Sequence, residues 1–363
     1  MRVLTIFGTR PEAIKLAPVL LQLSRYPQKF ESKVCVTAQH REMLDQVLGW
    51  FDIRPDYDLN LMTPNQDLSQ FTSRALSALT EVIKAENPDI VLVQGDTSTV
   101  LAAALAAFYQ RVPVGHVEAG LRTGNMYVPF PEEMNRRVTG VLAKYHYAPT
   151  ARSRAALLAE NVPPENVLVT GNTVLDAQRI TLSRSVEPVS QIDHGRKKIL
   201  VTAHRRENFG PAFESICTAL RDLSASNPDI DVVFPVHPNP NVREPVLRIL
   251  HGKSNILLLN PLRYEQFTHL LAQSYLVVTD SGGVQEEAAA LGKPTLVMRE
   301  MTERVEAVES GTAVLVGTCR DNIVTSVERL LRDGELRLQM SQPATAFGDG
   351  YAAEKIVSHL YSL

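Results

Sequence analysis

Short apolar runs rich in valine, isoleucine and leucine alternate along the chain with stretches in which apolar residues recur every three or four positions. The first kind of run is typical of a strand buried in a parallel sheet, and the second of an amphipathic helix packed against that sheet. Strands are predicted at residues 2–8, 33–38, 89–95, 112–119, 197–204, 231–237, 255–261, 275–280 and 294–299. Helices are predicted at residues 11–23, 41–51, 99–110, 213–223, 243–250 and 284–292. This order predicts an α/β protein built on doubly wound parallel sheets.

The alternation is interrupted by a polar segment without periodicity at residues 183–198, and we place a linker within residues 171–198. The predicted N-terminal domain spans residues 1–170 and the C-terminal domain residues 171–351, sizes at which each domain can bury its own core. The last segment, residues 352–363, has a helical pattern and is expected to pack back on the first domain. Two doubly wound domains side by side are expected to place the carboxyl ends of both sheets around one cleft. Ligands of such sheets bind outside these ends, so the cleft is the expected binding site.

Composition narrows the classes of function. The 363 residues carry a net charge of −3, which predicts no nucleic-acid partner and no anionic membrane surface. The N-terminal apolar run meets Arg10, Glu12 and Lys15 too early for a secretory leader, and the apolar run at residues 100–108 is shorter than the roughly 20 residues that span a bilayer. We therefore expect a cytoplasmic protein. The three cysteines are far apart and no histidine pair has metal-ligand spacing, so neither a disulfide framework nor a metal site is predicted.

Three carboxylates stand at or just beyond predicted strand ends: Asp96, Glu118 and Glu132. Any one of them is better explained as a helix cap or as the partner of an arginine, and candidate arginines are Arg122, Arg136 and Arg137. As a group at the mouth of the expected cleft they favour acid–base chemistry. Neighbouring carboxylates push one another's pKa values apart, which leaves one to donate a proton and another to accept it.

The first glycine turn offers a candidate anion site. Arg10 lies in the turn, and Lys15 lies one helical turn into a helix whose N-terminal amides and dipole favour negative charge. An ordinary strand–helix connection with two solvated cations is an equal alternative. The dinucleotide motif GxGxxG is missing from this turn.

A second glycine turn is more specific, and it consists of Ser281, Gly282 and Gly283. It follows a buried strand that ends at Asp280, and glycines let the backbone approach a phosphate while the first helical amides donate to it. Glu287 can accept hydrogen bonds from a ribose, and Arg304 offers a further cation. The alternative is a plain glycine turn whose helix carries acidic residues near its N-terminus, which the dipole also favours.

His204 ends another predicted strand beside two arginines. A histidine at such an end can hold a phosphate or exchange a proton, whereas a lone histidine is more often structural. The position at the cleft favours the first interpretation here. The remaining histidines considered lack this context, and they are His116, His146 and His237.

Six segments together carry a family resemblance: FGTRPEAIK, GDTST, GHVEAGLRTGN, PFPEEMNRR, TAHRREN and DSGGVQEEAAALGKP. The chain resembles the non-hydrolysing UDP-N-acetylglucosamine 2-epimerases from Arg2 to its final helix. The resemblance implies a GT-B architecture of two Rossmann-like domains, with the nucleotide mainly in the C-terminal one, and a homodimer. It also implies interconversion of UDP-GlcNAc and UDP-ManNAc for cell-surface polysaccharides, by elimination of UDP to 2-acetamidoglucal and re-addition, without NAD or metal.

The resemblance further assigns roles to residues. The family's catalytic carboxylates match Asp96, Glu118 and Glu132. Residues that bear on the diphosphate and the reacting sugar match Arg10, Lys15, Arg136 and His204. Contacts to uridine, phosphate and ribose match Phe267, Ser281, Gly282, Gly283, Glu287 and Arg304. Which carboxylate takes the proton from which epimer stays open.

The chain departs from its relatives at a regulatory position. Many bacterial relatives bind a second UDP-GlcNAc at an allosteric site, which Gln39 and His237 fit. Glu42 and Asn65 stand where those relatives place a glutamine and an arginine, so weaker diphosphate binding is expected. Leu262 replaces a polar uracil contact of some members, which leaves the base to backbone groups.

Two other functions stay open at this point. A GT-B glycosyltransferase would use the same nucleotide-sugar site, but it needs an acceptor and has no need of three carboxylates at the sugar. A catalytically silent nucleotide-sugar sensor would leave those carboxylates without a purpose. Incubation with UDP-GlcNAc alone separates the three functions.

Overall fold

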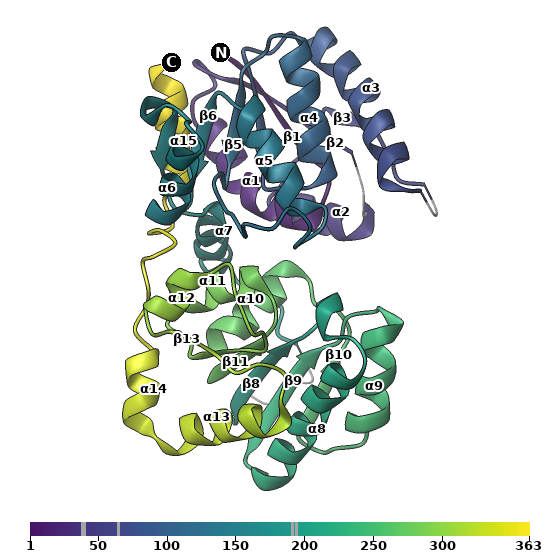
Figure 1. The fold of residues 1–363 in the computed structure, drawn as a ribbon, viewed down its shortest axis with the longest axis vertical. Helices are drawn as coiled ribbons and strands as arrows, with labels where there is room; N and C mark the ends of the chain where they lie inside the picture. Colours follow the sequence, from purple (N-terminus) through teal and green to yellow (C-terminus); the bar gives the residue numbers. More distant parts are fainter. Residues whose placement is uncertain (38–40, 64–65, 190–191, 193–194) are drawn as a thin grey trace. The chain divides into compact units, whose positions relative to one another are not determined.

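The computed structural model describes residues 1–37, 41–63, 66–189, 192 and 195–363. The chain folds into two compact units, coloured by sequence in Figure 1. The first unit comprises Met1–Ile180 and Gly348–Leu363, and the second comprises Thr181–Phe347. The first unit thus ends at Ile180 instead of residue 170, and the chain returns to it at Gly348 instead of residue 352.

The first unit is built on a seven-stranded parallel sheet in the order β3-β2-β1-β4-β5-β6-β7. Its strands are β1 (Arg2–Phe7), β2 (Glu31–Val36), β3 (Tyr57–Asp58), β4 (Ile90–Gln94), β5 (Val114–Val117), β6 (Tyr145–Ala148) and β7 (Val167–Val169). Its described helices are α1 (Arg10–Leu23), α2 (Arg41–Trp50), α3 (Leu68–Glu86), α4 (Ser98–Tyr109), α5 (Glu132–Leu142), α6 (Ala151–Ala159), the 3-10 turn η1 (Pro164–Asn166), α7 (Thr173–Leu182) and α15 (Ala352–Ser362). The apolar strand β4 is buried along its whole length at the centre of this sheet.

The alanines of α4 explain the packing beside β4. Alanine side chains are short, so they allow neighbouring helices to approach closely. The five buried alanines are Ala102, Ala103, Ala104, Ala106 and Ala107, each 0% exposed. Helix α4 packs between α3 and α5 in the first unit (Figure 1).

The second unit repeats the design with a six-stranded parallel sheet in the order β10-β9-β8-β11-β12-β13. Its strands are β8 (Lys197–Thr202), β9 (Ile230–Pro235), β10 (Ile256–Leu259), β11 (Leu276–Thr279), β12 (Thr295–Val297) and β13 (Ala313–Leu315). Its described helices are the 3-10 turn η2 (Arg206–Asn208), α8 (Pro211–Ser226), α9 (Pro240–Leu250), α10 (Tyr264–Gln273), α11 (Gly282–Ala290), α12 (Val305–Glu309), α13 (Arg320–Arg332) and α14 (Gly334–Met340).

Each sheet contains one point at which the order of the strands reverses. In the first unit β1 lies between β2 and β4, and in the second β8 lies between β9 and β11. Open sheets of this type bind ligands at such a point, outside the carboxyl ends of the strands. The loops that leave these ends begin at Gly8 and Gly95 in the first unit and at Ala203 and Asp280 in the second.

Helix α15 packs on α1, and α7 holds the first turn of α15. The carboxylate of Asp176 on α7 accepts hydrogen bonds from the backbone N–H groups of Ala352 at 3.0 Å and Ala353 at 2.9 Å. Further along α15, the ring of His359 lies 3.1 Å from the hydroxyl of Tyr147, measured between Nδ1 and Oη. Most of α7 therefore belongs with the first unit, which explains why that unit ends later in the chain than expected.

Among the described residues, the helices are either too short or too polar to cross a bilayer.

Candidate active site

The turn after β1 depends on a buried glutamate. Glu12 accepts hydrogen bonds from the N–H groups of Gly8 at 3.2 Å and Thr9 at 2.7 Å, and from the Thr97 hydroxyl at 2.9 Å. Burial raises the pKa of Glu12 to about 7, although these hydrogen bonds act in the opposite direction. A Cβ atom at position 8 would lie 2.1 Å from Oγ1 of Thr37, so only glycine fits there. The turns that follow β1 and β4 are thereby fixed against each other.

Glu118 follows β5 with a φ of 61°, a left-handed conformation that non-glycine residues rarely adopt. The ammonium group of Lys15 donates to both of its carboxylate oxygens, at 2.7 and 2.6 Å. The side-chain amide of Asn172 donates to Oε1 at 2.8 Å, and that of Gln94 donates to Oε2. Glu118 is buried, and these contacts make it a charge-assisted acceptor surrounded by donors.

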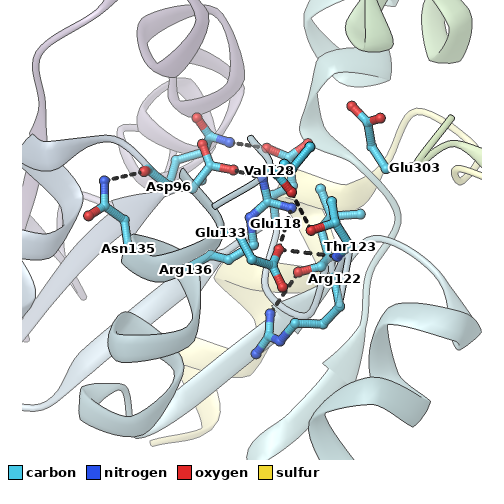
Figure 2. Close-up of polar contacts among 12 residues, drawn as sticks. Asp96, Glu118, Arg122, Thr123, Val128, Glu133, Asn135, Arg136 and Glu303 are labelled. Carbon is cyan, nitrogen blue, oxygen red and sulfur yellow. Dashed lines mark hydrogen bonds and ion pairs between the residues drawn. The ribbon is translucent and has the colours of Figure 1, made fainter. Parts of the chain in front are cut away.

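Asp96 has a different environment (Figure 2). Its carboxylate lies 2.6 Å from a guanidinium nitrogen of Arg136, and its backbone carbonyl accepts a hydrogen bond from the Asn135 amide at 2.9 Å. Burial raises the pKa of Asp96, and the charges of Glu118 and Glu132 act in the same direction, whereas Arg136 lowers it. The pKa of Asp96 is therefore raised despite its ion pair with Arg136.

Helix α5 supplies the remaining charges beside Asp96. Glu133 is fully buried, lies 3.4 Å from Arg136, and accepts the N–H of Thr123 at 3.1 Å (Figure 2). In the described part of the chain, Oε2 of Glu132 and Nε of Arg136 are buried without a hydrogen-bond partner. Buried polar atoms without a partner are uncommon in folded proteins, and both of these lie beside the carboxylate of Asp96.

Of the three arginines considered as ion-pair partners of these carboxylates, one pairs with a candidate residue and two do not. Arg136 does pair with Asp96. Arg122 instead binds Glu160 at 2.7 Å, and Arg137 lies 3.7 Å from the same carboxylate. The pairing explanation therefore holds for Asp96 through Arg136, while Glu118 is held by a lysine.

In the second unit, the turn after β8 is organised by Asp280. Its buried carboxylate accepts the N–H groups of His204 and Arg205, both at 2.9 Å, and the Asn208 amide at 3.1 Å. The ring of His204 stacks on that of His237, with centroids 5.6 Å apart. Burial lowers the pKa of His204, and Arg205 acts in the same direction, while Asp280 raises it.

Arginines surround one carboxylate at the start of α11. Glu303 lies 2.8 Å from Arg304, 2.7 Å from Arg299 and 3.7 Å from Arg205. Burial alone would raise the pKa of Glu303, but the arginines outweigh it and hold the pKa at about 2. A Cβ atom at Gly282 would lie 3.1 Å from Cζ of Arg304, so the guanidinium packs directly against the helix start.

The side chains expected to contact a nucleoside lie on α10 and α11. Glu287 is buried, and its Oε1 accepts a hydrogen bond from the Tyr264 hydroxyl at 3.5 Å. Phe267 on α10 is partly buried and packs against the apolar cluster beneath β8 and β11. Arg304 also donates to Glu286 at 2.8 Å, so in this structure it is paired with two carboxylates.

Comparison with known proteins identifies the family of this chain. The family model for UDP-N-acetylglucosamine 2-epimerase matches residues 22–361. A UDP-N-acetylglucosamine 2-epimerase of Yersinia pestis is 54% identical over 370 residues, which cover 99% of this chain and 98% of that protein. The chain belongs to the UDP-N-acetylglucosamine 2-epimerase family.

Solved structures of this epimerase family share the fold. The enzyme of Neisseria meningitidis bound to UDP-GlcNAc is 48% identical, with a TM-score of 0.95 and complete coverage of both chains. That of Methanocaldococcus jannaschii in complex with UDP-GlcNAc and UDP is 31% identical, with a TM-score of 0.85 and complete coverage of both chains. The two Rossmann-like units are therefore those of a GT-B epimerase, and the family's enzymes are isomerases.

Within the first unit of this family member, the structure gathers four of the residues singled out in the sequence: Lys15, Asp96, Glu118 and Arg136. Glu132 joins them through its charge effect on Asp96, and Arg10 begins α1. Lys15 contacts Glu118, which the sequence did not indicate. Gln39 and Asn65 lie outside the described residues. Among the residues that the structure describes, His, Cys, Asp and Glu do not form a group of three or more that could hold a metal ion.

The sequence analysis missed several residues near the carboxyl ends of the two sheets: Gln94, Glu133, Asn172, Asn208, Arg299 and Glu303. Each contacts a candidate residue or one of the turns through its side chain. Glu133 follows Glu132 directly, so the acidic pair was a signal that could have found it. The amides of Gln94 and Asn172 carry no such local signal.

Proposed function

We propose that this protein interconverts UDP-GlcNAc and UDP-ManNAc by inverting C2 of the sugar. Family membership supports the substrate, because the Neisseria relative is bound to UDP-GlcNAc in its solved structure. The observation that carries the chemistry is the contrast between Asp96 and Glu118. Burial raises the pKa of Asp96, and Glu118 is fixed as an acceptor by Lys15 and two amides. Pairs of this kind serve as acid and base.

The proposed route is an elimination followed by an addition. A carboxylate takes the C2 hydrogen as a proton, the C1–C2 double bond forms, and the C1–O bond breaks with its electron pair on the UDP oxygen. The product is 2-acetamidoglucal and UDP. In the return step a proton adds to C2 from the opposite face and the UDP oxygen adds to C1. The reaction is redox-neutral, so it needs no net oxidant or reductant. We assign the proton transfers to Asp96, Glu118 and Glu132.

We assign UDP to the second unit. Helix α11 begins at Gly282, and the amides of its first turn, among them those of Gly282 and Gly283, favour a phosphate at the helix N-terminus. The Ser281 N–H already donates to the Thr279 hydroxyl at 2.9 Å, so Ser281 is assigned to the phosphate through its side chain. Glu287 is assigned to the ribose and Phe267 to the uridine. His204 and Arg304 are assigned to the diphosphate, with Arg10, Lys15 and Arg136 stabilising the charge that develops as UDP departs. In this assignment Arg304 exchanges a carboxylate partner for a phosphate.

One experiment tests the reaction and separates it from the alternatives. The protein is incubated in D2O with UDP-GlcNAc and no acceptor, and the products are followed by proton NMR. We expect UDP-ManNAc that carries deuterium at C2, because the carboxylates exchange protons with solvent. An unchanged sugar would favour a sensor, and turnover that requires an acceptor would favour a transferase. Product with only protium at C2 would exclude the elimination route.

We also propose that the protein is a homodimer. Four apolar side chains on neighbouring helices of the first unit are exposed: Phe108, Tyr109, Val138 and Val141. Val141 is 84% exposed, and exposed apolar groups that lie together mark protein interfaces more often than isolated ones. Light scattering after gel filtration should give twice the chain mass, and Val141→Glu should shift it toward the monomer. A monomeric wild-type protein would contradict the proposal.

A further inference from the structure

Asn172 is a buried amide whose orientation is determined by its own hydrogen bonds. It lies between β7 and α7 and is 2% exposed. Its Oδ1 accepts the backbone N–H of Val174 at 3.1 Å, so the other end of the amide must be the nitrogen. That nitrogen donates to Oε1 of Glu118 at 2.8 Å. The contact joins two positions that are 54 residues apart in the chain.

Glu118 is held by an amide on each oxygen. Asn172 donates to Oε1 and Gln94 to Oε2, while Lys15 donates to both. Lysine is a flexible point charge and leaves the plane of a carboxylate undefined, whereas two amides on opposite oxygens define it. The orientation of the carboxylate therefore depends on the amides, and its charge is balanced by Lys15.

The backbone beside Asn172 is fixed by a second segment of the chain. Gly171 has a φ of 89°, and a Cβ atom on Gly348 would lie 2.8 Å from Cα of Gly171. Gly348 is the residue at which the chain returns to the first unit. The loop that carries Asn172 is thus packed against this returning segment, which limits its movement.

We propose that Asn172 is a positioning residue for the epimerisation, which holds the Glu118 carboxylate in the plane that proton transfer at C2 requires. The proposal rests on the proposed function. Asn172 acts through Glu118, so its loss should reduce turnover more than substrate binding. Misplacement of a reacting group by about 1 Å can cost on the order of 100-fold in rate.

The variant Asn172→Asp separates this role from a structural one. Aspartate keeps an oxygen for the N–H of Val174 and replaces the donor to Glu118 by an acceptor. At pH 8.5 two like charges face each other, and we expect kcat to fall about 10- to 100-fold with a smaller change in KM. At lower pH the two carboxylates share a proton, the hydrogen bond returns, and the ratio of variant to wild-type kcat should rise. Lys15, Asp96 and His116 also face Glu118 in both proteins, so any difference between the two pH profiles originates from the added carboxylate, acting on Glu118 directly or through these groups.

Asn87→Asp is the matched control, because Asn87 is a helix C-cap in the same unit with no contact to Glu118 in the described structure. Its kcat ratio should stay near one at every pH. A flat ratio for Asn172→Asp, or one equal to the control, would overturn the proposal. If Asn172→Asp does not fold at pH 8.5, Asn172→Ser removes the amide without adding charge. A wild-type kcat in that variant would also overturn the proposal.

Failure of the proposed function is distinguishable from failure of this inference. A wild-type protein that leaves UDP-GlcNAc unchanged would contradict the function itself. Thermal unfolding of Asn172→Asp across the same pH range then still reports the contact, since its stability should recover toward wild type as the pH falls. Active wild-type protein with a pH-independent variant ratio would leave the function intact and exclude the positioning role.

Discussion

At the scale of single residues, the carboxylates of the candidate site differ in their hydrogen-bond and ion-pair partners. Glu118 accepts hydrogen bonds from Lys15 and two amides, whereas Asp96 has one guanidinium and lies in a setting that raises its pKa. Glu132 keeps a buried oxygen without a hydrogen-bond partner among the described residues. The three carboxylates thus differ in the partners that surround them, and burial raises the pKa of Asp96.

Replacement of each acid by its amide preserves shape and removes proton transfer. For Asp96→Asn, Glu118→Gln and Glu132→Gln we expect turnover to fall by about 100- to 10,000-fold, the range that general acid–base groups contribute. UDP affinity, measured by calorimetry, should change far less, because the proposed phosphate contacts lie on α11. Glu81→Gln is the control, since that side chain is 74% exposed on α3. Near-normal turnover in all three amide variants would show that the carboxylates have another role.

At the scale of elements, the sequence pattern located nine of the thirteen described strands and seven of the fifteen described α-helices, but few of the contacts between them. The run at residues 2–8 became β1 (Arg2–Phe7), and the pattern at residues 99–110 became α4 (Ser98–Tyr109). Periodicity reports which face of an element is buried, so such elements are readable locally. The bond between Asn172 and Glu118 depends on how β5 and β7 lie in the sheet, which no local pattern encodes.

Another contact between elements gives a prediction about pH. Glu12 joins the turns after β1 and β4, and its pKa is raised to about 7 from an ordinary 4.5. As the pH rises through this window the unfolded chain loses the proton first, so the free energy of unfolding falls, in total by about 3 kcal/mol. Glutamine does not titrate and can bind the same partners. The stability of Glu12→Gln relative to wild type should therefore increase by about this amount between pH 4.5 and pH 8.

Urea unfolding of both proteins at the two pH values measures the difference. Glu81→Gln serves again as the control, because its exposed side chain should leave the pH dependence unchanged. Parallel pH curves for wild type and Glu12→Gln would show that Glu12 is already ionised in the folded protein. The buried capping arrangement at the β1–α1 turn would then be held by a charge.

At the scale of the whole molecule, the two units divide the proposed work. The first supplies the acids and bases, and the second supplies a glycine turn at a helix start with arginines beside it. In both units these residues follow the carboxyl ends of strands, which is the edge at which open sheets bind ligands, and those strand ends were readable from sequence. The late boundary at Ile180 was not readable, because the bonds from Asp176 to α15 link α7 to a helix at the far end of the chain.

Regulation is the last property that belongs to this scale. A second UDP-GlcNAc acting as an effector needs cations at its phosphates, and the family resemblance predicts that Glu42 and Asn65 replace a glutamine and an arginine of such relatives. Arg41 is the nearest replacement in sequence, but it already lies 3.2 Å from Asp45 and 2.5 Å from Asp58. A ligand shifts a conformational equilibrium only by its difference in affinity for the two states, so a weakened site gives weak activation.

We therefore expect UDP-ManNAc alone to be converted without added UDP-GlcNAc. The measurement is the initial rate in the reverse direction, with traces of UDP-GlcNAc removed from the substrate beforehand. The time course should be linear from the start, and small additions of UDP-GlcNAc should leave its slope unchanged. A long lag that a small addition abolishes would show that the effector site works despite Glu42 and Asn65. His237→Ala would then be the next variant, and loss of the activation in that protein would place the effector beside the stacked pair of His204 and His237.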